Sequence, residues 1–171
     1  IPKIEIMSIE VIQTLVCIID AKDKYTNGHS IRVAQYSKLI SKALGDTEEE
    51  QKRVYYSALL HDIGKIGIPD TIINKPAALT AEEYDIVKTH PDIGSQILKS
   101  ITSMKEISVG ARWHHEHFDG SGYPDKLKGE NIPKIARIIC VADAYDAMTS
   151  NRSYRNYMAQ ADVRKEFEEN K

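Results

Sequence analysis

Apolar residues recur every three or four positions along most of the chain, the spacing that places them on one face of an α-helix. The first such stretch contains Ile6, Ile9, Ile12, Val16 and Ile19. It is interrupted at Asn27-Gly28, and a second stretch runs from about Ser30 to Gly45, a residue type favoured just after helices. Convincing strand patterns are absent, so the sequence predicts an all-α chain.

Capping boxes mark three further helix starts, because a Ser or Thr and a Glu three residues later satisfy free N–H groups there. The pairs are Thr47 with Glu50, Thr80 with Glu83, and Ser103 with Glu106. The helix after Thr47 is expected to deliver His61-Asp62 at its end. The helix after Thr80 is expected to end near His90-Pro91, since the residue before a proline disfavours the helical conformation. Residues 64–76 are predicted to form a loop.

The second half continues the helical pattern. A helix after Ser103 is expected to place Ile107, Ala111 and His114 on one face. Residues 118–131 are rich in Gly, Asp and Pro and are predicted to form a loop. Pro133 suits the first turn of a further helix, on which one face contains Ile135, Ile139, Ala142, Asp143 and Asp146. The tail after Met158 is predicted to be a polar helix anchored by Phe167.

Composition fits one globular domain. The chain has 171 residues, 42% hydrophobic and 28% charged, with a formal net charge of -2. This balance argues against a partner that is a DNA or RNA polymer, which needs clustered excess cations. No apolar stretch reaches the ~18 residues of a membrane span. Cys17 and Cys140 are expected to be buried small hydrophobes in a reducing compartment.

Histidines carry the candidate chemistry. Taken singly, a histidine is more often a satisfied core or surface residue than a ligand. Five of the six, however, fall at predicted helix ends or loops: His29, His61, His90, His114 and His115. Asp143 lies on an apolar helix face, where a buried carboxylate needs a cation beside it. Imidazoles with carboxylates are ligands for iron, manganese, zinc or nickel, and the two oxygens of Asp62 could bridge a metal pair.

Ordered motifs resemble a known family. The segment His61-Asp62-Ile63-Gly64-Lys65 resembles the signature of the HD superfamily of metal-dependent phosphohydrolases, and residues 114–124 resemble the second signature of its HD-GYP subfamily. Blocks at 23–30, at His90-Pro91 and at 143–155 match the same subfamily in the same order.

The resemblance implies an all-α fold, a single HD-type bundle of roughly six to eight helices around a dinuclear metal site. Residues 1–22 would be an N-terminal helix that continues from an upstream regulatory domain. Residues 23–171 would be the HD-GYP catalytic domain with a truncated C-terminus. The first residue, Ile1 rather than Met, is taken as a hint that the chain was cut from a longer one.

The implied activity is a metal-dependent phosphodiesterase that hydrolyses the bacterial second messenger cyclic di-GMP to linear pGpG, and further to GMP in some members. Two alternatives stay open: an HD hydrolase of another cyclic dinucleotide, and a catalytically weak sensor or interaction module. A purely structural helical domain is a fourth interpretation. Substituting Asp62 would then affect stability alone.

The resemblance assigns two divalent ions per chain, iron or manganese ahead of zinc or nickel. Their ligands would be His29, His61, Asp62, His90, His114, His115 and Asp143, with Asp62 bridging. A hydroxide held between the metals would attack phosphorus in line, with Lys65 neutralising phosphate oxygens. Some members bind a third metal through a carboxylate four residues before the first histidine. Tyr25 stands there, so a two-metal site is expected.

Substrate contacts are assigned to Lys65, Tyr123, Arg152 and Arg155, and loop shape to Gly120, Gly122 and Pro124. Glu116 and Asp146 are expected to orient the histidines or Lys65. Each role has a simpler alternative: Lys65 could cap helix-end carbonyls, the two arginines could be solvated, and Tyr123 could serve the turn alone.

The expected partners are cyclic di-GMP, an upstream sensory or receiver domain, and a second copy of the chain in a homodimer. The first helix has two alternative roles that stay open: it continues a helix of the upstream domain, or it dimerises through its apolar face. No membrane contact by this domain is expected. The expected location is the cytoplasm.

Overall fold

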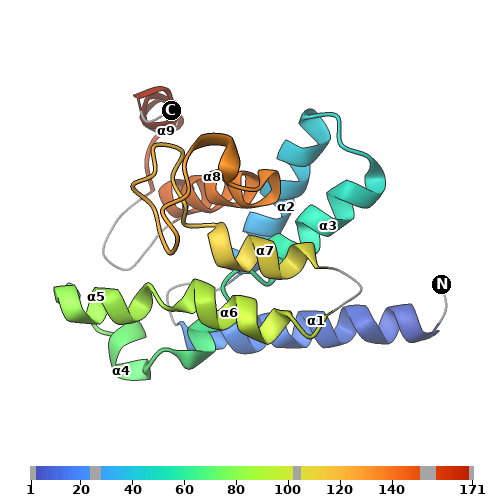
Figure 1. Ribbon diagram of the computed structural model, residues 1–171, viewed down its shortest axis with the longest axis horizontal. Helices are drawn as coiled ribbons and strands as arrows, with labels where there is room; N and C mark the ends of the chain where they lie inside the picture. Colours follow the sequence, from blue (N-terminus) through green and yellow to red (C-terminus); the bar gives the residue numbers. More distant parts are fainter. Residues whose placement is uncertain (1–2, 24–27, 102–104, 151–156, 170–171) are drawn as a thin grey trace.

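The computed structural model describes residues 3–23, 28–101, 105–150 and 157–169, and in these ranges every regular element is a helix (Figure 1). The α-helices are α1 (Lys3–Lys22), α2 (His29–Ala43), α3 (Glu48–Leu59), α4 (Asp70–Ile73), α5 (Ala81–Val87), α6 (His90–Leu98), α7 (Glu106–Trp113), α8 (Lys134–Thr149) and α9 (Gln160–Glu169). Two short 3-10 helices are η1 (Ile63–Gly67) and η2 (Gly129–Asn131). The all-α prediction is confirmed.

The bundle is built around α7. This helix packs against α3, α6 and α8, while α2 packs against α3 and α8. In Figure 1, α1 and α6 lie below α7, and α2, α3 and α8 lie above it. The core is apolar and includes Val33, Ala58, Leu60 and Ile139, each 1% exposed or less. Val16 and Ile19 bring α1 onto the same core, as the apolar spacing predicts.

Two of the three capping boxes are confirmed. At α3, the Glu50 amide donates to Thr47 Oγ1 and the Thr47 amide donates to Glu50 Oε2. Thr80 and Glu83 make the same reciprocal pair at α5. Ser103 lies outside the described residues, and α7 begins at Glu106 after the N-cap residue Lys105.

Helix α6 was not predicted. The preceding helix, α5, ends at Val87, near the expected place, and His90 lies at a helix boundary as expected. However, His90 is the first residue of α6 and does not end α5. Pro91 sits in the first turn of α6, where its missing N–H would have no partner in any case. The predicted loop at 64–76 likewise contains η1 and the single-turn helix α4. Short turns of this kind lack the repeated apolar spacing that reveals longer helices.

Three side-chain expectations are corrected. Val163, at 3% exposed, anchors α9, whereas Phe167 is only partly buried. Cys17 is exposed because it lies outside the stripe of α1 that contains Val16 and Ile19. Cys140 is partly buried. Among the described residues, no helix has the length and apolar character needed to cross a membrane.

Gly110 lets α7 approach α3 closely. A Cβ atom at this position would lie 2.0 Å from Ser57 Oγ and 2.8 Å from Ile139 Cδ1. Alanine is the better helix former by about 1 kcal/mol, but overpacking a tight core commonly costs about 1–3 kcal/mol. The hydroxyl of Ser57 is bonded directly to its Cβ atom and cannot move far aside. The cost of this clash therefore exceeds the gain in helix propensity, so alanine at position 110 should destabilise the fold.

We expect Gly110→Ala to lower the free energy of unfolding by about 1–3 kcal/mol, measured by urea denaturation. Ser57→Ala removes the atom that clashes first. The double variant should therefore lose less stability than the sum of the two single changes. Strict additivity would contradict this account of the α3–α7 contact.

Candidate metal centre

The seven predicted ligands all lie in the described part of the chain and converge on one place. Most come from helix ends: His29 opens α2, His61 and Asp62 follow α3, His90 opens α6, and His114 and His115 follow α7. Asp143 alone comes from a helix interior, in α8. Residues separated by more than one hundred positions in sequence therefore share a single polar centre inside an apolar bundle.

Asp62 lies at the middle of this centre. Its Oδ1 is 3.3 Å from His90 Nε2 and 3.9 Å from His114 Nε2. Its Oδ2 is 3.4 Å from His61 Nε2 and 3.8 Å from His29 Nε2. Each carboxylate oxygen thus faces a different pair of imidazole nitrogens, which is the arrangement of a ligand that can bridge two ions.

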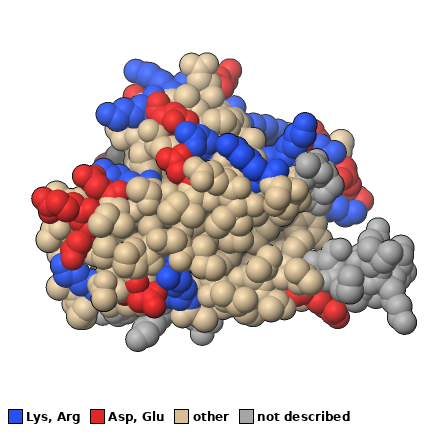
Figure 2. Space-filling model, turned by 60° about the horizontal axis from the view of Figure 1, so that its bottom comes forward, with Lys and Arg blue, Asp and Glu red and all other residues tan. Residues whose placement is uncertain are grey.

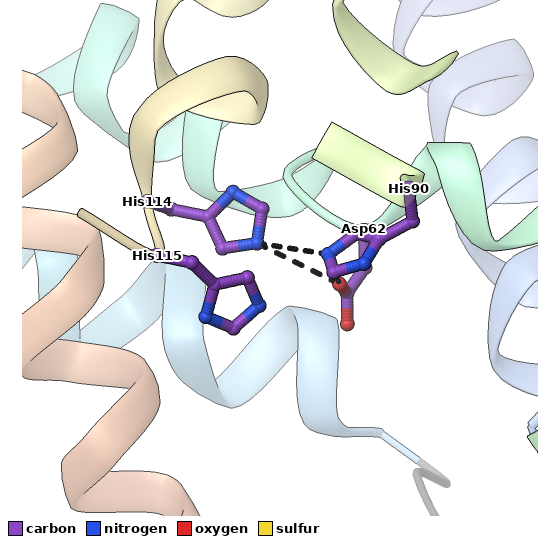
Figure 3. Close-up of side chains that lie close together, drawn as sticks. All are labelled: Asp62, His90, His114 and His115. Atoms are coloured by element: carbon purple, nitrogen blue, oxygen red, sulfur yellow. Dashed lines mark hydrogen bonds and ion pairs between the residues drawn. The ribbon is translucent and has the colours of Figure 1, made fainter. Parts of the chain in front are cut away.

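The donor atoms form two groups. The first contains Asp62, His90, His114 and His115, drawn in Figure 3, and the second contains His29, His61 and Asp143. Within each group the candidate ligand atoms all lie within 4.8 Å of one another. His90 Nε2 and His114 Nε2 approach to 3.3 Å, and His29 Nε2 lies 3.3 Å from Asp143 Oδ1.

Backbone carbonyls orient the rings. The Nδ1 atom of His61 lies 2.6 Å from the carbonyl oxygen of Ala58, and that of His90 lies 2.8 Å from Val87. His114 Nδ1 lies 2.9 Å from the carbonyl oxygen of Ala111. With Nδ1 donating to a carbonyl, Nε2 presents its lone pair to the centre, the tautomer that metal-ligating histidines adopt.

The protonation states suit a cation. Burial lowers the pKa of His61 and of His114, and burial together with neighbouring His90 lowers the pKa of His115 to about 3. These rings are therefore neutral near pH 7. His61 Nε2 is fully buried without a hydrogen-bond partner, which is costly unless the lone pair meets another electrophile.

The carboxylates are held ionised. Burial alone would raise the pKa of Asp62, but the positive charge of Lys65 holds it well below its usual range. Burial also opposes ionisation of Asp143, yet the hydrogen bond and charge of His29 lower its pKa. His29 shows the reciprocal effect: burial opposes its charge, but Asp143 and Asp146 raise its pKa to about 9. Without a metal, a protonated His29 would supply the positive charge that Asp143 needs beside it.

This donor set fits a divalent metal. Buried neutral imidazoles, an unpartnered buried nitrogen and two ionised carboxylates are the chemistry that such an ion requires. The structure therefore contains a buried His/Asp cluster that is compatible with divalent metal binding.

Two further groups support the cluster. Lys65 Nζ lies 2.7 Å from Asp62 Oδ2 and 3.3 Å from Asp23 Oδ2, and it is not a helix-end cap exposed to solvent. Asp146 accepts a hydrogen bond from His29 Nδ1 at 2.8 Å, a contact compatible with the orienting role expected for this residue. Arg32 Nε donates to the other oxygen of Asp146 at 2.6 Å.

The Gly-Tyr-Pro loop covers one side of the centre. The ring of Tyr123 stacks on His115 with 4.8 Å between centroids. Gly122 permits this approach, because a Cβ atom there would lie 2.3 Å from the His117 nitrogen. Gly120 adopts a left-handed conformation, φ 86°, and Pro124 follows Tyr123 through a cis peptide bond.

Glu116 has a different position from the one expected. Its buried carboxylate accepts hydrogen bonds from the amides of Asp125, at 2.7 Å, and Leu127, at 2.9 Å. It therefore fastens the Gly-Tyr-Pro loop rather than orienting a histidine or Lys65. The sequence gives no local signal for this role, since the partners are backbone groups.

Other placements complete the comparison. Arg152 and Arg155 lie outside the described residues. Sequence reasoning missed Arg32, although its position three residues after His29 on one helix face is a usable signal.

Comparison with known proteins agrees with the geometry. Residues 13–167 match the HD domain family. The chain belongs to this family, so the predicted family is confirmed.

Two relatives illustrate the similarity. The chain is 42% identical over 149 residues to the "Cyclic di-GMP phosphodiesterase response regulator RpfG" of Xanthomonas campestris, covering 85% of this chain and 39% of the relative. It is 41% identical over 141 residues to "3'3'-cGAMP-specific phosphodiesterase 3" of Vibrio cholerae, covering 82% and 31%. The chain thus spans less than half of each relative's length.

Solved structures share the fold. A Bdellovibrio bacteriovorus protein, Bd1817, described as an HDG"Y"P protein, matches with TM-score 0.69 at 24% identity over 85% of this chain and 46% of that chain. The HD domain of Listeria monocytogenes PgpH, solved in complex with cyclic di-AMP, matches with TM-score 0.66 at 19% identity, covering 91% and 80%.

We expect Glu116→Gln to release the Gly-Tyr-Pro loop locally. The amide side chain offers one acceptor oxygen where the carboxylate offers two, so one buried N–H loses its partner at a cost of about 1–3 kcal/mol. Hydrogen exchange at the Asp125 or Leu127 amide should accelerate roughly 10–100-fold. Amides of α2 serve as the internal control, and unchanged exchange at both loop amides would contradict the assignment.

Proposed function

We propose that this chain is a metal-dependent phosphodiesterase that hydrolyses cyclic di-GMP to linear pGpG. The single observation that carries the proposal is the position of Asp62, whose two oxygens face two separate groups of histidine nitrogens. Relatives at 42% and 43% identity are named cyclic di-GMP phosphodiesterases, which supports the substrate class.

The proposed cofactors are two divalent ions, iron or manganese ahead of zinc or nickel. His29, His61 and Asp143 would hold one ion, and His90, His114 and His115 the other, with Asp62 shared. When bound, such a pair lowers the pKa of water and neutralises charge that develops on a phosphodiester. Tyr25, which stands where a third-metal carboxylate would be, lies outside the described residues.

Residues of the chain prepare the centre for a phosphodiester. Asp62 stays ionised in a buried position, so its shared placement is fixed before substrate arrives. Lys65 is held between Asp62 and Asp23, where its positive charge can pair with a phosphate oxygen. Burial raises the pKa of Tyr123, so its phenol keeps its proton and can donate to the substrate. Arg152 and Arg155 are proposed to contact phosphate or guanine.

A second cyclic dinucleotide is a candidate substrate. Three Vibrio cholerae relatives are named 3'3'-cGAMP-specific phosphodiesterases, at 36–41% identity. Hydrolysis of that cyclic dinucleotide is therefore the alternative, and a catalytically weak sensor is a further one. Conversion of cleaved pGpG to GMP stays a prediction.

The partners beyond the substrate stay predictions as well. The lower face of Figure 1, turned forward in Figure 2, has a wide central area without Lys, Arg, Asp or Glu. The apolar face named for the predicted homodimer is not available for it, because Val16 and Ile19 pack onto the core. A homodimer through α1 would instead use the exposed Val11, Leu15 and Ile18. The upstream regulatory domain and the cytoplasmic location are proposed on the sequence argument alone.

The test is a joint measurement on the chain purified without oxygen. Metal per chain is determined, and cyclic di-GMP and 3'3'-cGAMP are supplied separately while linear products are followed by chromatography. Two metals with pGpG formation is the expected result. Two metals without turnover of either dinucleotide would overturn the enzyme proposal in favour of a sensor.

We expect Asp62→Asn to abolish turnover while the helical content is kept. Loss of residues that merely orient ligands costs 10–100-fold in activity, so losing the shared ligand should cost at least about 100-fold. Asp70→Asn is the matched control, because Asp70 is exposed and pairs only with surface Lys22 among the contacts described. Native turnover in Asp62→Asn would refute the proposed role.

A further inference from the structure

Helix α2 begins without a cap of its own. Its N-cap residue is Gly28, with φ 69°, and no side chain at that position accepts a hydrogen bond. The first N–H groups of a helix have no partner within it and need an acceptor from elsewhere. This need is acute here, because the first residue of α2 is the candidate ligand His29.

Asp20 of α1 supplies that acceptor. Its Oδ2 accepts a hydrogen bond from the Gly28 amide at 3.0 Å, and its Oδ1 accepts one from Ser30 Oγ at 2.8 Å. The two bonds bracket His29 on both sides along the chain. The carboxylate of Asp20 in α1 thus holds the two residues that flank His29, and so fixes the backbone position of His29 at the start of α2.

The ring of His29 is fixed separately. Asp146 accepts from Nδ1, and Arg32 in turn fixes Asp146 with two contacts, at 2.6 Å and 3.0 Å. Asp20 fixes the backbone position of His29, and Asp146 fixes the orientation of its imidazole ring. Since a displacement of about 1 Å is enough to spoil a ligand geometry, both constraints matter for Nε2.

We infer that Asp20 is a positioning residue for His29, and through it for the ion held by His29, His61 and Asp143. This inference rests on the proposed function, which supplies the metal. The other donor group comes from α6, from the turn after α3 and from the end of α7, so its geometry does not pass through the start of α2. Asp20 therefore acts on one ion of the pair rather than on both.

In the experiment, the metal-free chain is titrated with Mn²⁺ alone, and the heat of binding is measured by calorimetry. The native chain should show two binding steps. His29→Gln and His115→Gln identify which step belongs to which group. In Asp20→Asn, the amide accepts one bond in place of two, so affinity at the His29 step should fall roughly 10–100-fold while the other step is unchanged.

Two further variants separate positioning from stability. Ser30→Ala removes one of the two bonds to Asp20 and should weaken the same step by less; it also tests the inference if Asp20→Asn fails to fold. Asp46→Asn is the matched control, because Asp46 likewise accepts from a serine, Ser41 Oγ at 2.6 Å, but at the far end of α2. Asp46→Asn should leave the affinity of both Mn²⁺-binding steps unchanged.

The outcomes are distinct. Two native steps that stay unchanged in Asp20→Asn and Ser30→Ala, or that weaken equally, would overturn the inference while the proposed function stands. A native chain that binds no metal would overturn the proposed function and the inference with it. Selective weakening of the His29 step supports both.

Discussion

A buried carboxylate between two sets of imidazoles is the constraint on which the rest of this structure depends. Taking the charge of Asp62 out of water is expensive, and a low-dielectric interior tolerates it only beside compensating positive charge. Lys65 provides part of that compensation at 2.7 Å. Ions held by the surrounding nitrogens would provide the rest, which would account for the four imidazole rings that face one carboxylate.

The bundle serves this centre by ending its helices there. In the last turns of α3 and α7, the carbonyl groups of Ala58 and Ala111 accept from the Nδ1 atoms of His61 and His114. Close packing fixes the distances between elements. A Cβ atom at Gly64 would lie 1.8 Å from the His90 carbonyl oxygen, so the turn that contains Asp62 lies directly against α6. The same close packing of the helices therefore stabilises the fold and sets the distances between the candidate ligands.

The sequence predicted much of this because the relevant signals are local. Capping boxes at Thr47 and Thr80 fix helix starts through contacts three residues apart. The motif residues predicted a set of candidate ligands, and the fold brings these residues together. Helix α6 escaped because a proline next to its first residue was interpreted as a stop. The contacts of Glu116 and Asp20 were not predicted for another reason. Both residues bond to backbone or side-chain groups that only the tertiary fold brings near.

The contacts around His29 show how the position of a candidate ligand depends on elements far from it in sequence. Asp146 belongs to α8 and Asp20 to α1, yet both bond to the first turn of α2 or its flank. A change in either helix can thus reach one half of the centre without touching a ligand. Such coupling is a property of the packed bundle and has no counterpart in the motif alone.

The central claim is that Asp62 is shared by two ions. A crystal structure of the chain grown with Mn²⁺, with anomalous scattering recorded for that metal, tests it most directly. The account predicts two anomalous peaks, one beside each oxygen of Asp62, with His29, His61 and Asp143 around the first and His90, His114 and His115 around the second. A single peak, or two peaks that leave Asp62 uncoordinated, would contradict it.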